Sequence, residues 1–382
     1  MRLPACDLLI GLLRLVLLAV TAVLALGTVL PVVRKPYWWI RSFDFPRLQI
    51  AALALGALAA LAAVSRARGP EPLDGWALAT LAAVVAFQTA RMLPYSPLWR
   101  VQTVRAEAPD RDRSLRLVVS NVLMTNRDGA RWLRTIRAED PDVVAAVETD
   151  AWWAETAGAL RETHPHTVLL PQDDTYGMCV FSRLPIVEHT VEHLVEPEVP
   201  SLFLTLRLPS GEPLHLVVLH PRPPRPDVGQ DSTLRDAELV LAARRVARMG
   251  PPVVVCGDLN DVAWSETTTL FQRIAGVLDP RVGRGLFSTF HANHRLLRYP
   301  LDHVFHTPDL ALVRLARLGH VGSDHFPMAI ELALCARAEA EQDAPEETPD
   351  ARVHAAEVVE EVQEFKAAET PKDAAERKAQ DV

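Results

Sequence analysis

The central part of this 382-residue chain, residues 115–335, contains no lysine. It holds 27 acidic residues against 21 arginines, which gives it a net charge of −6. Proteins that bind duplex nucleic acid draw much of their affinity from basic side chains that neutralise phosphates. A segment with this charge does not have the basic surface typical of such proteins.

Cysteine is also scarce, and none of it forms a recognisable motif. The four cysteines, Cys6, Cys179, Cys256 and Cys335, form no C-x-x-C pair and no cysteine–histidine spacing of a metal site. Cys179 and Cys256 lie inside apolar runs, which indicates buried apolar side chains. The polar motifs of the central segment also lack a serine or cysteine nucleophile with a paired base, which disfavours covalent catalysis.

Composition divides the chain into three parts. Residues 1–114 are apolar with short basic stretches and carry a net charge of +6, whereas residues 339–382 carry −9. The acidic segment 336–382 is rich in alanine and glutamate and shows no apolar face, so we expect a solvated or disordered tail. Between these ends lies the central segment 115–335, which the linker 101–114 joins to the N-terminal part.

Residues 1–100 contain three long apolar runs, at about 8–33, 48–64 and 76–93. Each is close to the roughly 20 residues that cross the core of a bilayer. The middle run is short and rich in alanine, which is typical of a helix that packs closely against neighbours. A cleaved signal peptide is the alternative for the first run, but two further runs follow it. We therefore predict three uncleaved transmembrane helices.

The side of the membrane is harder to predict. Basic residues are more numerous in the first loop and after the third run than in the loop between the second and third runs. Positive residues concentrate on the cytoplasmic side of membrane proteins. This count favours a cytoplasmic central segment, although the margin depends on where Arg91 lies.

Six short polar motifs follow or end apolar runs in the central segment. They are Ser120-Asn121-Val122, Val147-Glu148-Thr149, Leu219-His220-Pro221, Gly257-Asp258-Leu259-Asn260-Asp261, Leu301-Asp302-His303 and Gly322-Ser323-Asp324-His325-Phe326-Pro327. Functional side chains are often held at the ends of rigid strands. Buried carboxylates need a cation or a histidine partner. The acids, amides and imidazoles of these motifs suit a hard metal ion and an attacking water.

The spacing of apolar residues predicts a mixture of strands and helices between residues 115 and 335. Pro209-Ser210-Gly211-Glu212 is a hairpin signal between strands 202–208 and 214–219. Helical spacing covers residues 128–139, 232–249 and 264–274. Hairpin-connected strands exclude a purely parallel doubly wound sheet. The pattern favours the α+β class, with two packed β-sheets and outer helices.

The order of the motif residues resembles the endonuclease/exonuclease/phosphatase superfamily. The resemblance rests on Asn121, Glu148, His220, Asp258-x-Asn260, Asp302 and Asp324-His325, and it covers about residues 115–335. Pancreatic deoxyribonuclease, abasic-site endonucleases, neutral sphingomyelinases and inositol-polyphosphate 5-phosphatases belong to this superfamily. The resemblance implies a four-layer sandwich of two mixed sheets. It also implies hydrolysis of phosphoester bonds with Mg²⁺, with Mn²⁺ as an alternative.

The resemblance assigns five residues to the metal and the water. Glu148 is similar to the family's principal Mg²⁺ ligand, and Asn121 to a nearby ligand or phosphate-orienting amide. Asp324 would assist at the metal. Asp258 would orient or deprotonate the attacking water, and Asn260 would hold that water or the phosphate.

Five further residues are assigned to the phosphate. His220 and His325 would donate hydrogen bonds to its non-bridging oxygens as charge develops there. Asp302 would fix the tautomer of His325 and raise its basicity. Tyr176 and Arg222 are expected to contact the phosphate.

The remaining histidines and tryptophans have structural interpretations. His303 would point to the opposite face of its strand from Asp302, which indicates packing. Trp152 and Trp153 fit the core side of a helix. We expect most of the other histidines to lie at the surface. They are His164, His166, His189, His193, His291, His294 and His306.

Three functions remain open from the sequence. A membrane-anchored phosphoesterase acting on a lipid-linked or small phosphorylated substrate is favoured, because tethering raises the effective concentration of membrane substrates. A nuclease is the alternative, for which Arg222, Arg225 and Arg235 would supply a local basic cluster. An inactive interaction domain is the third, and no protein partner is inferred. Similarity to bacterial relatives with three N-terminal spans implies the cytoplasmic membrane but an outward-facing domain, against the charge count.

Overall fold

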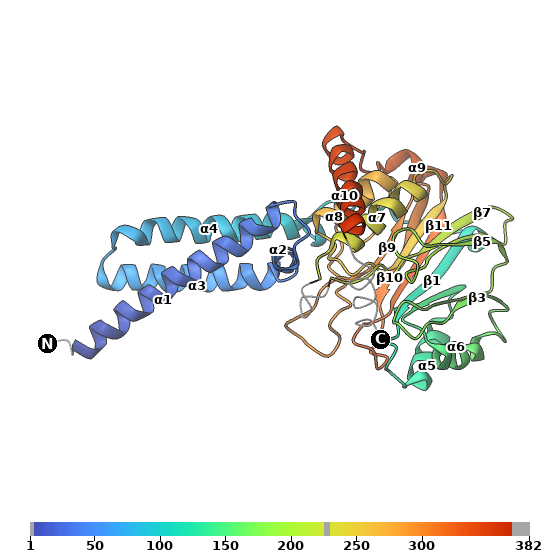
Figure 1. Ribbon diagram of the computed structural model, residues 1–382, viewed down its shortest axis with the longest axis horizontal. Coiled ribbons are helices and arrows are strands. Elements are labelled where there is room, and N and C mark those ends of the chain that lie inside the picture. The colour runs from blue at the N-terminus through green and yellow to red at the C-terminus, as the bar shows by residue number, and fades with distance from the viewer. Residues whose placement is uncertain (1–3, 225–229, 369–382) are drawn as a thin grey trace.

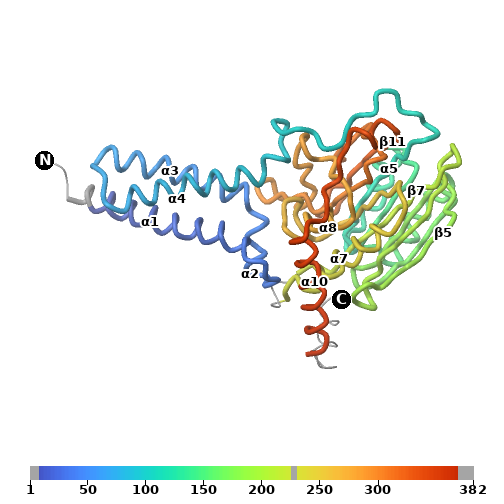
Figure 2. Tube along the Cα trace, turned by 90° about the horizontal axis from the view of Figure 1, so that it is seen from above, coloured from blue at the N-terminus to red at the C-terminus, as the bar shows by residue number. Residues whose placement is uncertain are grey.

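The protein is described by a computed structural model that covers residues 4–224 and 230–368. A bundle of long helices leads into a unit of packed sheets and helices (Figure 1). The long helices are α1 (Pro4–Val29), α3 (Arg47–Arg68) and α4 (Pro72–Met92), with the short α2 (Trp38–Arg41) between the first two. Viewed from above, the long helices run side by side into the larger unit (Figure 2).

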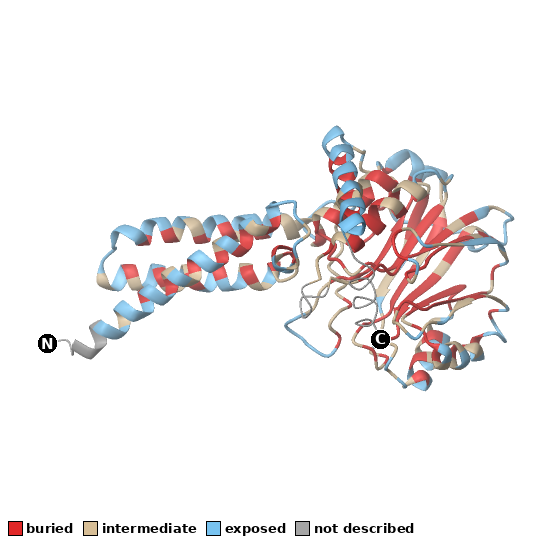
Figure 3. Cartoon of the chain, viewed as in Figure 1, coloured by how far each residue is buried: buried red, intermediate tan, exposed pale blue. Residues whose placement is uncertain are grey.

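Three helices are long and apolar enough to cross a membrane, as predicted. The candidate spans are Leu8–Val32, Arg47–Arg68 and Pro72–Tyr95. Inside the bundle, Leu61 and Leu81 are fully buried. Outside it, Leu53 and Trp76 keep 61% and 77% of their surface exposed, and the outer faces of the bundle are largely exposed (Figure 3). An apolar outer surface on long helices is what a lipid bilayer would cover.

The first sheet has six strands in the order β10-β11-β1-β2-β4-β3. Their bounds are β1 Ser114–Asn121, β2 Val143–Val147, β3 His166–Leu170, β4 Met178–Ser182, β10 Leu310–Arg317 and β11 Met328–Leu334. β1 and β2 are parallel, and the other neighbours are antiparallel. The sheet is therefore mixed, as predicted.

The second sheet has five strands in the order β5-β6-β7-β8-β9. Their bounds are β5 Ile186–Glu192, β6 Ser201–Arg207, β7 Pro213–Val218, β8 Val253–Asp258 and β9 Asp302–His306. β7 and β8 are its parallel pair. β5 was not predicted, because its edge position leaves most of its residues exposed and gives no apolar run.

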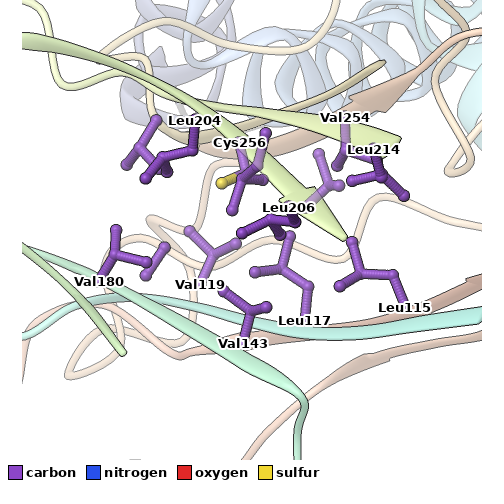
Figure 4. Close-up of a cluster of buried hydrophobic side chains, with 14 of the residues drawn as sticks. Leu115, Leu117, Val119, Val143, Val180, Leu204, Leu206, Leu214, Val254 and Cys256 are labelled. Carbon is purple, nitrogen blue, oxygen red and sulfur yellow. The ribbon is translucent and has the colours of Figure 1, made fainter. Parts of the chain in front are cut away.

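The side chains of the central strands alternate between two cores, as the pleat of a strand requires. In β1, Leu117 and Val119 face the core between the sheets, whereas Val118 faces the outer helices. In β8, Val254 and Cys256 belong to the inter-sheet core. Figure 4 shows side chains of both sheets meeting there. Burial on both faces explains why these strands read as continuous apolar runs.

Helices cover the outer face of each sheet, which completes the predicted four layers. On the first sheet lie α5 (Gly129–Glu139) and α6 (Ala151–Ala157), where Trp132 and Trp153 are fully buried. On the second lie α7 (Thr233–Val246) and α8 (Glu266–Ala275). The α+β four-layer prediction is confirmed.

The tail differs from its prediction. After the short α9 (Ala336–Glu341), α10 runs from Pro349 to Ala368 and packs beside α7 and α8 (Figure 1). The predicted disorder is wrong for this helix. Its buried stripe of Ala351, Ala355, Val358 and Val362 has helical spacing but small side chains, which gave it a weak apolar signal. Residues 369–382 lie outside the described part of the chain.

Candidate active site

The candidate catalytic residues gather where parallel strands of both sheets end. Asn121 ends β1, and Glu148 directly follows β2, the parallel neighbour of β1. In the second sheet, Asp258 ends β8 and pairs in register with Asp302, the first residue of β9. Parallel strands end at the same edge of a sheet, so sequence-distant side chains meet there.

Two close backbone approaches hold these strand ends. Gly257 has a φ of +139°, and a Cβ atom there would lie 1.9 Å from the carbonyl oxygen of Leu219. A Cβ atom at Gly177 would lie 1.9 Å from the carbonyl oxygen of Thr149. Only glycine fits such contacts. Each contact lies one residue from a candidate catalytic side chain, so the glycines position the site.

An amide joins the two central carboxylates. The Nδ2 atom of Asn121 lies 2.7 Å from Oε1 of Glu148 and 3.0 Å from Oδ2 of Asp258, and it donates to both. Its Oδ1 atom accepts from the backbone N–H of Leu123. The structure therefore places Asn121 as an amide that orients carboxylates from both sheets. A metal ligand would need the opposite orientation of this amide.

The carboxylates fit a divalent cation. Ligand atoms of Glu148, His220 and Asp258 lie within 4.8 Å of one another. Burial raises the pKa of Glu148, and the nearby charge of Asp258 adds to the rise. A cation between the two carboxylates would offset the cost of burying them. Hard oxygen donors are the ligands that Mg²⁺ prefers, so the carboxylates of Glu148 and Asp258 fit this ion.

His325 lies between two carboxylates. Its Nδ1 atom is 2.7 Å from Oδ2 of Asp302, and its Nε2 atom is 3.5 Å from Oδ2 of Asp258. Burial alone would lower the pKa of His325, but the charges of Asp302 and Asp258 and the hydrogen bond to Asp302 raise it to about 10. The imidazole is therefore protonated at neutral pH and can donate to an anionic oxygen.

His220 lies on the other side of the carboxylate pair. Its Nε2 atom is 3.9 Å from Oε1 of Glu148, and its ring packs against that of Tyr176 with centroids 5.9 Å apart. Among the described residues, its buried Nδ1 atom has no hydrogen-bond partner. The nitrogen that approaches Glu148 is Nε2, so this atom is placed to contact a group bound at the carboxylates.

Asn260 is held by the chain around it. Its backbone N–H donates to Oδ1 of Asp258 over 2.9 Å, and its Nδ2 atom donates to the carbonyl of Pro221 over 2.9 Å. Its φ of +52° turns the loop sharply after β8. The amide therefore links the two loops that carry Asp258 and His220, and its contact with water or phosphate stays a prediction.

Asp324, Arg222 and Tyr176, which were predicted to contact the metal or the phosphate, lie around the carboxylate cluster and do not form part of it. Asp324 belongs to neither group of possible metal ligands in the described part of the chain, although its charge acts on His325. Arg222 is 2% exposed, pairs with Glu196 over 2.6 Å and lies over the ring of Tyr176. This placement favours support of Tyr176 over direct contact with a phosphate. Tyr176 itself is buried beside His220.

The predictions for the other histidines have mixed outcomes. His303 faces away from the site, as predicted, and contacts Arg281 and the carbonyl of Asp261. His164 and His306 are buried and not at the surface as expected. Each bonds a nearby backbone carbonyl or hydroxyl, which allows burial of a neutral ring.

Sequence reasoning missed Phe290. Its ring lies 4.9 Å from that of His325, centroid to centroid, and its backbone forms a bridge with His325. Phe290 comes from the long irregular connection between α8 and β9. No periodic signal marks such a loop residue, so the sequence offered no way to find it.

The fold and the site together define a class. A family model described as the endonuclease/exonuclease/phosphatase family matches residues 118–325, more than half of the chain. The chain belongs to this family, whose members are divalent-metal-dependent hydrolases of phosphoester bonds. No match is found among curated proteins.

Several solved structures are similar in fold. An endonuclease/exonuclease/phosphatase from Beutenbergia cavernae is 21% identical, with 58% of this chain and 72% of that chain covered and a TM-score of 0.46. The human Nocturnin catalytic domain is 16% identical, with coverages of 60% and 97% and a TM-score of 0.49. TDP2 from D. rerio, complexed with a single-strand DNA product, is 18% identical, with 57% and 98% covered and a TM-score of 0.48.

Proposed function

We propose that the protein is a membrane-anchored, Mg²⁺-dependent phosphoesterase that hydrolyses a phosphodiester, phosphomonoester or pyrophosphate of a lipid-linked substrate. The observation that carries this proposal is the contact between the candidate membrane spans and the loops of the site. Tyr95, at the end of the third span, donates from its hydroxyl to the carbonyl of Ala263 over 2.6 Å. Ala263 lies three residues after Asn260.

Further contacts tie the same loop to the helix bundle. Arg91 donates to the carbonyl of Trp264 over 2.8 Å, and the indole of Trp264 donates to the carbonyl of Asp44 over 2.7 Å. Leu301, the residue before Asp302, packs in the same apolar cluster. The candidate site is thus one loop away from the end of the spans, which suits a substrate that lies in the bilayer.

The residues of the site divide the hydrolytic work. Asp258, oriented by Asn121, would accept a proton from the attacking water. His325 in its protonated form would donate a hydrogen bond to a phosphate oxygen as negative charge grows there, and His220 would donate to another. Glu148 would be the main ligand of the metal, beside the water that Asp258 activates. When bound, Mg²⁺ supplies Lewis-acid stabilisation of the phosphoryl and leaving oxygens.

A nuclease remains the alternative proposal, and the charge distribution argues against it. Of the three arginines considered for nucleic-acid binding, Arg222 and Arg235 are buried and paired with acids. Arg225 lies outside the described residues. An inactive interaction domain is disfavoured, because such a role would not require Asn121 and His325 to be held at hydrogen-bonding distance from the three carboxylates of the site.

Release assays with Mg²⁺ on plasmid DNA, a phospholipid and a polyprenyl pyrophosphate test the proposal. Wild type is compared with Glu148→Ala and His325→Ala, and with Glu188→Ala and His189→Ala, two exposed residues of β5. We expect lipid turnover that only the first pair abolishes. Cleavage of DNA but not of lipids would favour the nuclease. Equal activity of all variants would disprove the site.

A separate measurement is needed to show on which side of the membrane the catalytic domain lies. The charge of the loops favours a cytoplasmic catalytic domain, whereas similarity to bacterial three-span relatives favours an outward one. Alkaline phosphatase fused after Trp99 is active only outside the cytoplasm. High activity of this fusion would refute the cytoplasmic placement, and low activity with high expression would support it.

A further inference from the structure

A pocket of about 590 Å³ lies apart from the catalytic carboxylates, where the start of α3 meets the sheet unit. Leu48 of α3 lines one side, and Leu286 and Leu296 of the connection between α8 and β9 line another. Three arginines, Arg295, Arg298 and Arg317, are also part of the lining. Because α3 is a candidate span that begins at Arg47, this pocket lies at the expected boundary between bilayer and water.

The arginines form a positive cluster without acidic partners. Across residues 4–224 and 230–368, none of the three forms an ion pair with a carboxylate. The guanidinium groups of Arg298 and Arg317 lie 5.0 and 4.4 Å from the ring centre of the same residue, Phe326. The positive charge of Arg298 also acts on Arg317. Like charges repel, so an anion that contacts both groups would be stabilising.

Backbone carbonyls fix the orientation of two of these arginines. Arg317 donates to the carbonyl of Ser288 over 2.7 Å, and Arg298 donates to the carbonyls of His294 and Ala292, each over 3.1 Å. Partial burial and the charge of Arg298 lower the pKa of Arg317. Oriented guanidinium groups of this kind suit bidentate recognition of phosphate oxygens.

The rim of the pocket is apolar and exposed. Leu296 and Leu297 keep 84% and 50% of their surface exposed, and Leu48 keeps 55%. The side chain of Gln49 donates to the carbonyl of Leu296 over 2.6 Å, which ties this loop to the first turn of α3. Exposed leucines beside a candidate membrane span are suited to contact with lipid chains.

We propose that this pocket binds the phosphate headgroup of an anionic membrane lipid, with Leu296 and Leu297 among the neighbouring acyl chains. The inference rests on the membrane placement in the proposed function but not on its chemistry. The guanidinium groups of Arg298 and Arg317 pack against the ring of Phe326, which directly follows His325 in the chain. An anionic lipid in the pocket would therefore order the segment that holds the catalytic imidazole.

Native mass spectrometry of the full chain in neutral detergent tests headgroup binding. Dioleoyl phosphatidic acid, dioleoyl phosphatidylcholine and inorganic phosphate are the probes. We expect retention of phosphatidic acid, at least about tenfold weaker in Arg295→Gln and Arg317→Gln, which each remove a phosphate contact. Arg317→Lys should recover part of the binding. Arg314→Gln, at an exposed arginine of β10 that pairs with Glu139, is the control and should bind as wild type.

Three outcomes would overturn the proposal. Equal retention of phosphatidylcholine would show that the pocket does not recognise the net negative charge of the headgroup. Binding of inorganic phosphate as tightly as phosphatidic acid would assign the pocket to a free anion. Unchanged binding in both glutamine variants would place the lipid elsewhere. Arg295 makes no described hydrogen bond, so its variant keeps the test valid if Arg317→Gln fails to fold.

A second measurement locates the loop itself. Leu296→Trp is placed in nanodiscs that contain anionic lipid, with or without bromine on the acyl chains. The fluorescence of the added tryptophan is the difference between Leu296→Trp and wild type in the same discs. We expect this difference to fall by more than about half when the acyl chains are brominated. Quenching by aqueous iodide in its place would refute insertion. Neither measurement requires turnover, so a failure of the hydrolytic proposal would be seen separately.

Discussion

The Nδ1 atom of His325 lies 2.7 Å from Oδ2 of Asp302, and both side chains are buried at the edge of the site. The other carboxylate oxygen of Asp302 has no hydrogen-bond partner among the described residues. The interaction of Asp302 is therefore directed at the imidazole. It fixes the tautomer of the neutral ring and stabilises the charged ring, and it leaves Nε2 facing Asp258.

The first prediction concerns Asp302→Asn. Removing the negative charge lowers the pKa of His325 from about 10 toward its ordinary value of 6.5. The alkaline limb of kcat/KM should move to lower pH by about 1–3 units. At neutral pH, kcat/KM should fall by about 10²–10⁴-fold. The pH profile with bis(p-nitrophenyl) phosphate and Mg²⁺ measures both effects.

The same pair affects stability in a defined pH window. Since the pKa of His325 is raised on folding, the stabilisation is fully present below about pH 6.5 and is lost as the pH rises through about 10. Wild type should lose thermal stability over this range more steeply than Asp302→Asn. Asp140→Asn, which changes an exposed carboxylate, is the control. Parallel pH profiles for wild type and Asp302→Asn would contradict the assignment.

The second prediction concerns metal binding without turnover. Ionised Glu148 is destabilising when buried without a cation, because burial raises its pKa. A divalent cation at 100 times its dissociation constant would stabilise the fold by about 2.7 kcal/mol. Mg²⁺ or Mn²⁺ should therefore raise the melting temperature of wild type, and EDTA should reverse the rise.

Glu148→Gln separates this effect from general ion binding. The neutral side chain should leave the melting temperature without metal equal or higher and abolish most of the rise with Mg²⁺. Glu188→Gln, at an exposed position of β5, should respond as wild type. An equal rise for all three proteins would place the cation outside the proposed site.

The third prediction concerns the backbone at Gly257. Alanine there would place Cβ 1.9 Å from the carbonyl oxygen of Leu219, at a φ of +139° that side chains rarely adopt. Gly257→Ala should cost about 2 kcal/mol or more in stability and displace Asp258 from His325. Activity should fall at least about tenfold even in folded protein. Gly250→Ala, where a Cβ atom meets nothing within 4 Å, should be close to neutral. A fully active Gly257→Ala would contradict the positioning role.

The sequence predicted the central strands well because they are buried on both faces. Strands such as β2 and β8 appear as short apolar runs that end on an acid, and the motif order then identified the family. The edge strand β5 lacked this signal, because most of its side chains face solvent. Its pairing with β6 depends on contacts that no local pattern encodes.

The surroundings of the site were less predictable for a similar reason. The ion pair of Arg222 with Glu196 joins residues 26 positions apart in the chain. This buried pair favours support of Tyr176, and the phosphate contact of Arg222 stays a prediction. The contact of Phe290 with His325 comes from an irregular loop. Motif spacing identifies side chains of the right chemistry, whereas long-range packing decides which of them point into the site.

The acidic tail contacts both the loop after the first span and the helices that cover the second sheet. Arg34 pairs with Asp350 over 2.9 Å, and Lys35 pairs with Glu361 over 2.9 Å. These pairs are substantially exposed and contribute little on their own. The stabilising contact is the buried stripe that includes Val358, which packs with the core side chains of α7 and α8. Helix α10 thus covers an apolar surface that would otherwise face water.

The fourth prediction follows from that stripe. Val358→Asp buries a carboxylate among apolar side chains and should lower the free energy of unfolding by about 1–3 kcal/mol. Val353, on the same helix, is 59% exposed, so Val353→Asp makes the same chemical change in water and should have little effect. Thermal melting of both variants in detergent, with limited proteolysis of the tail, measures the difference. Cleavage should become faster only in Val358→Asp. Equal melting and cleavage of the two variants would show that α10 does not pack on the sheet unit in solution.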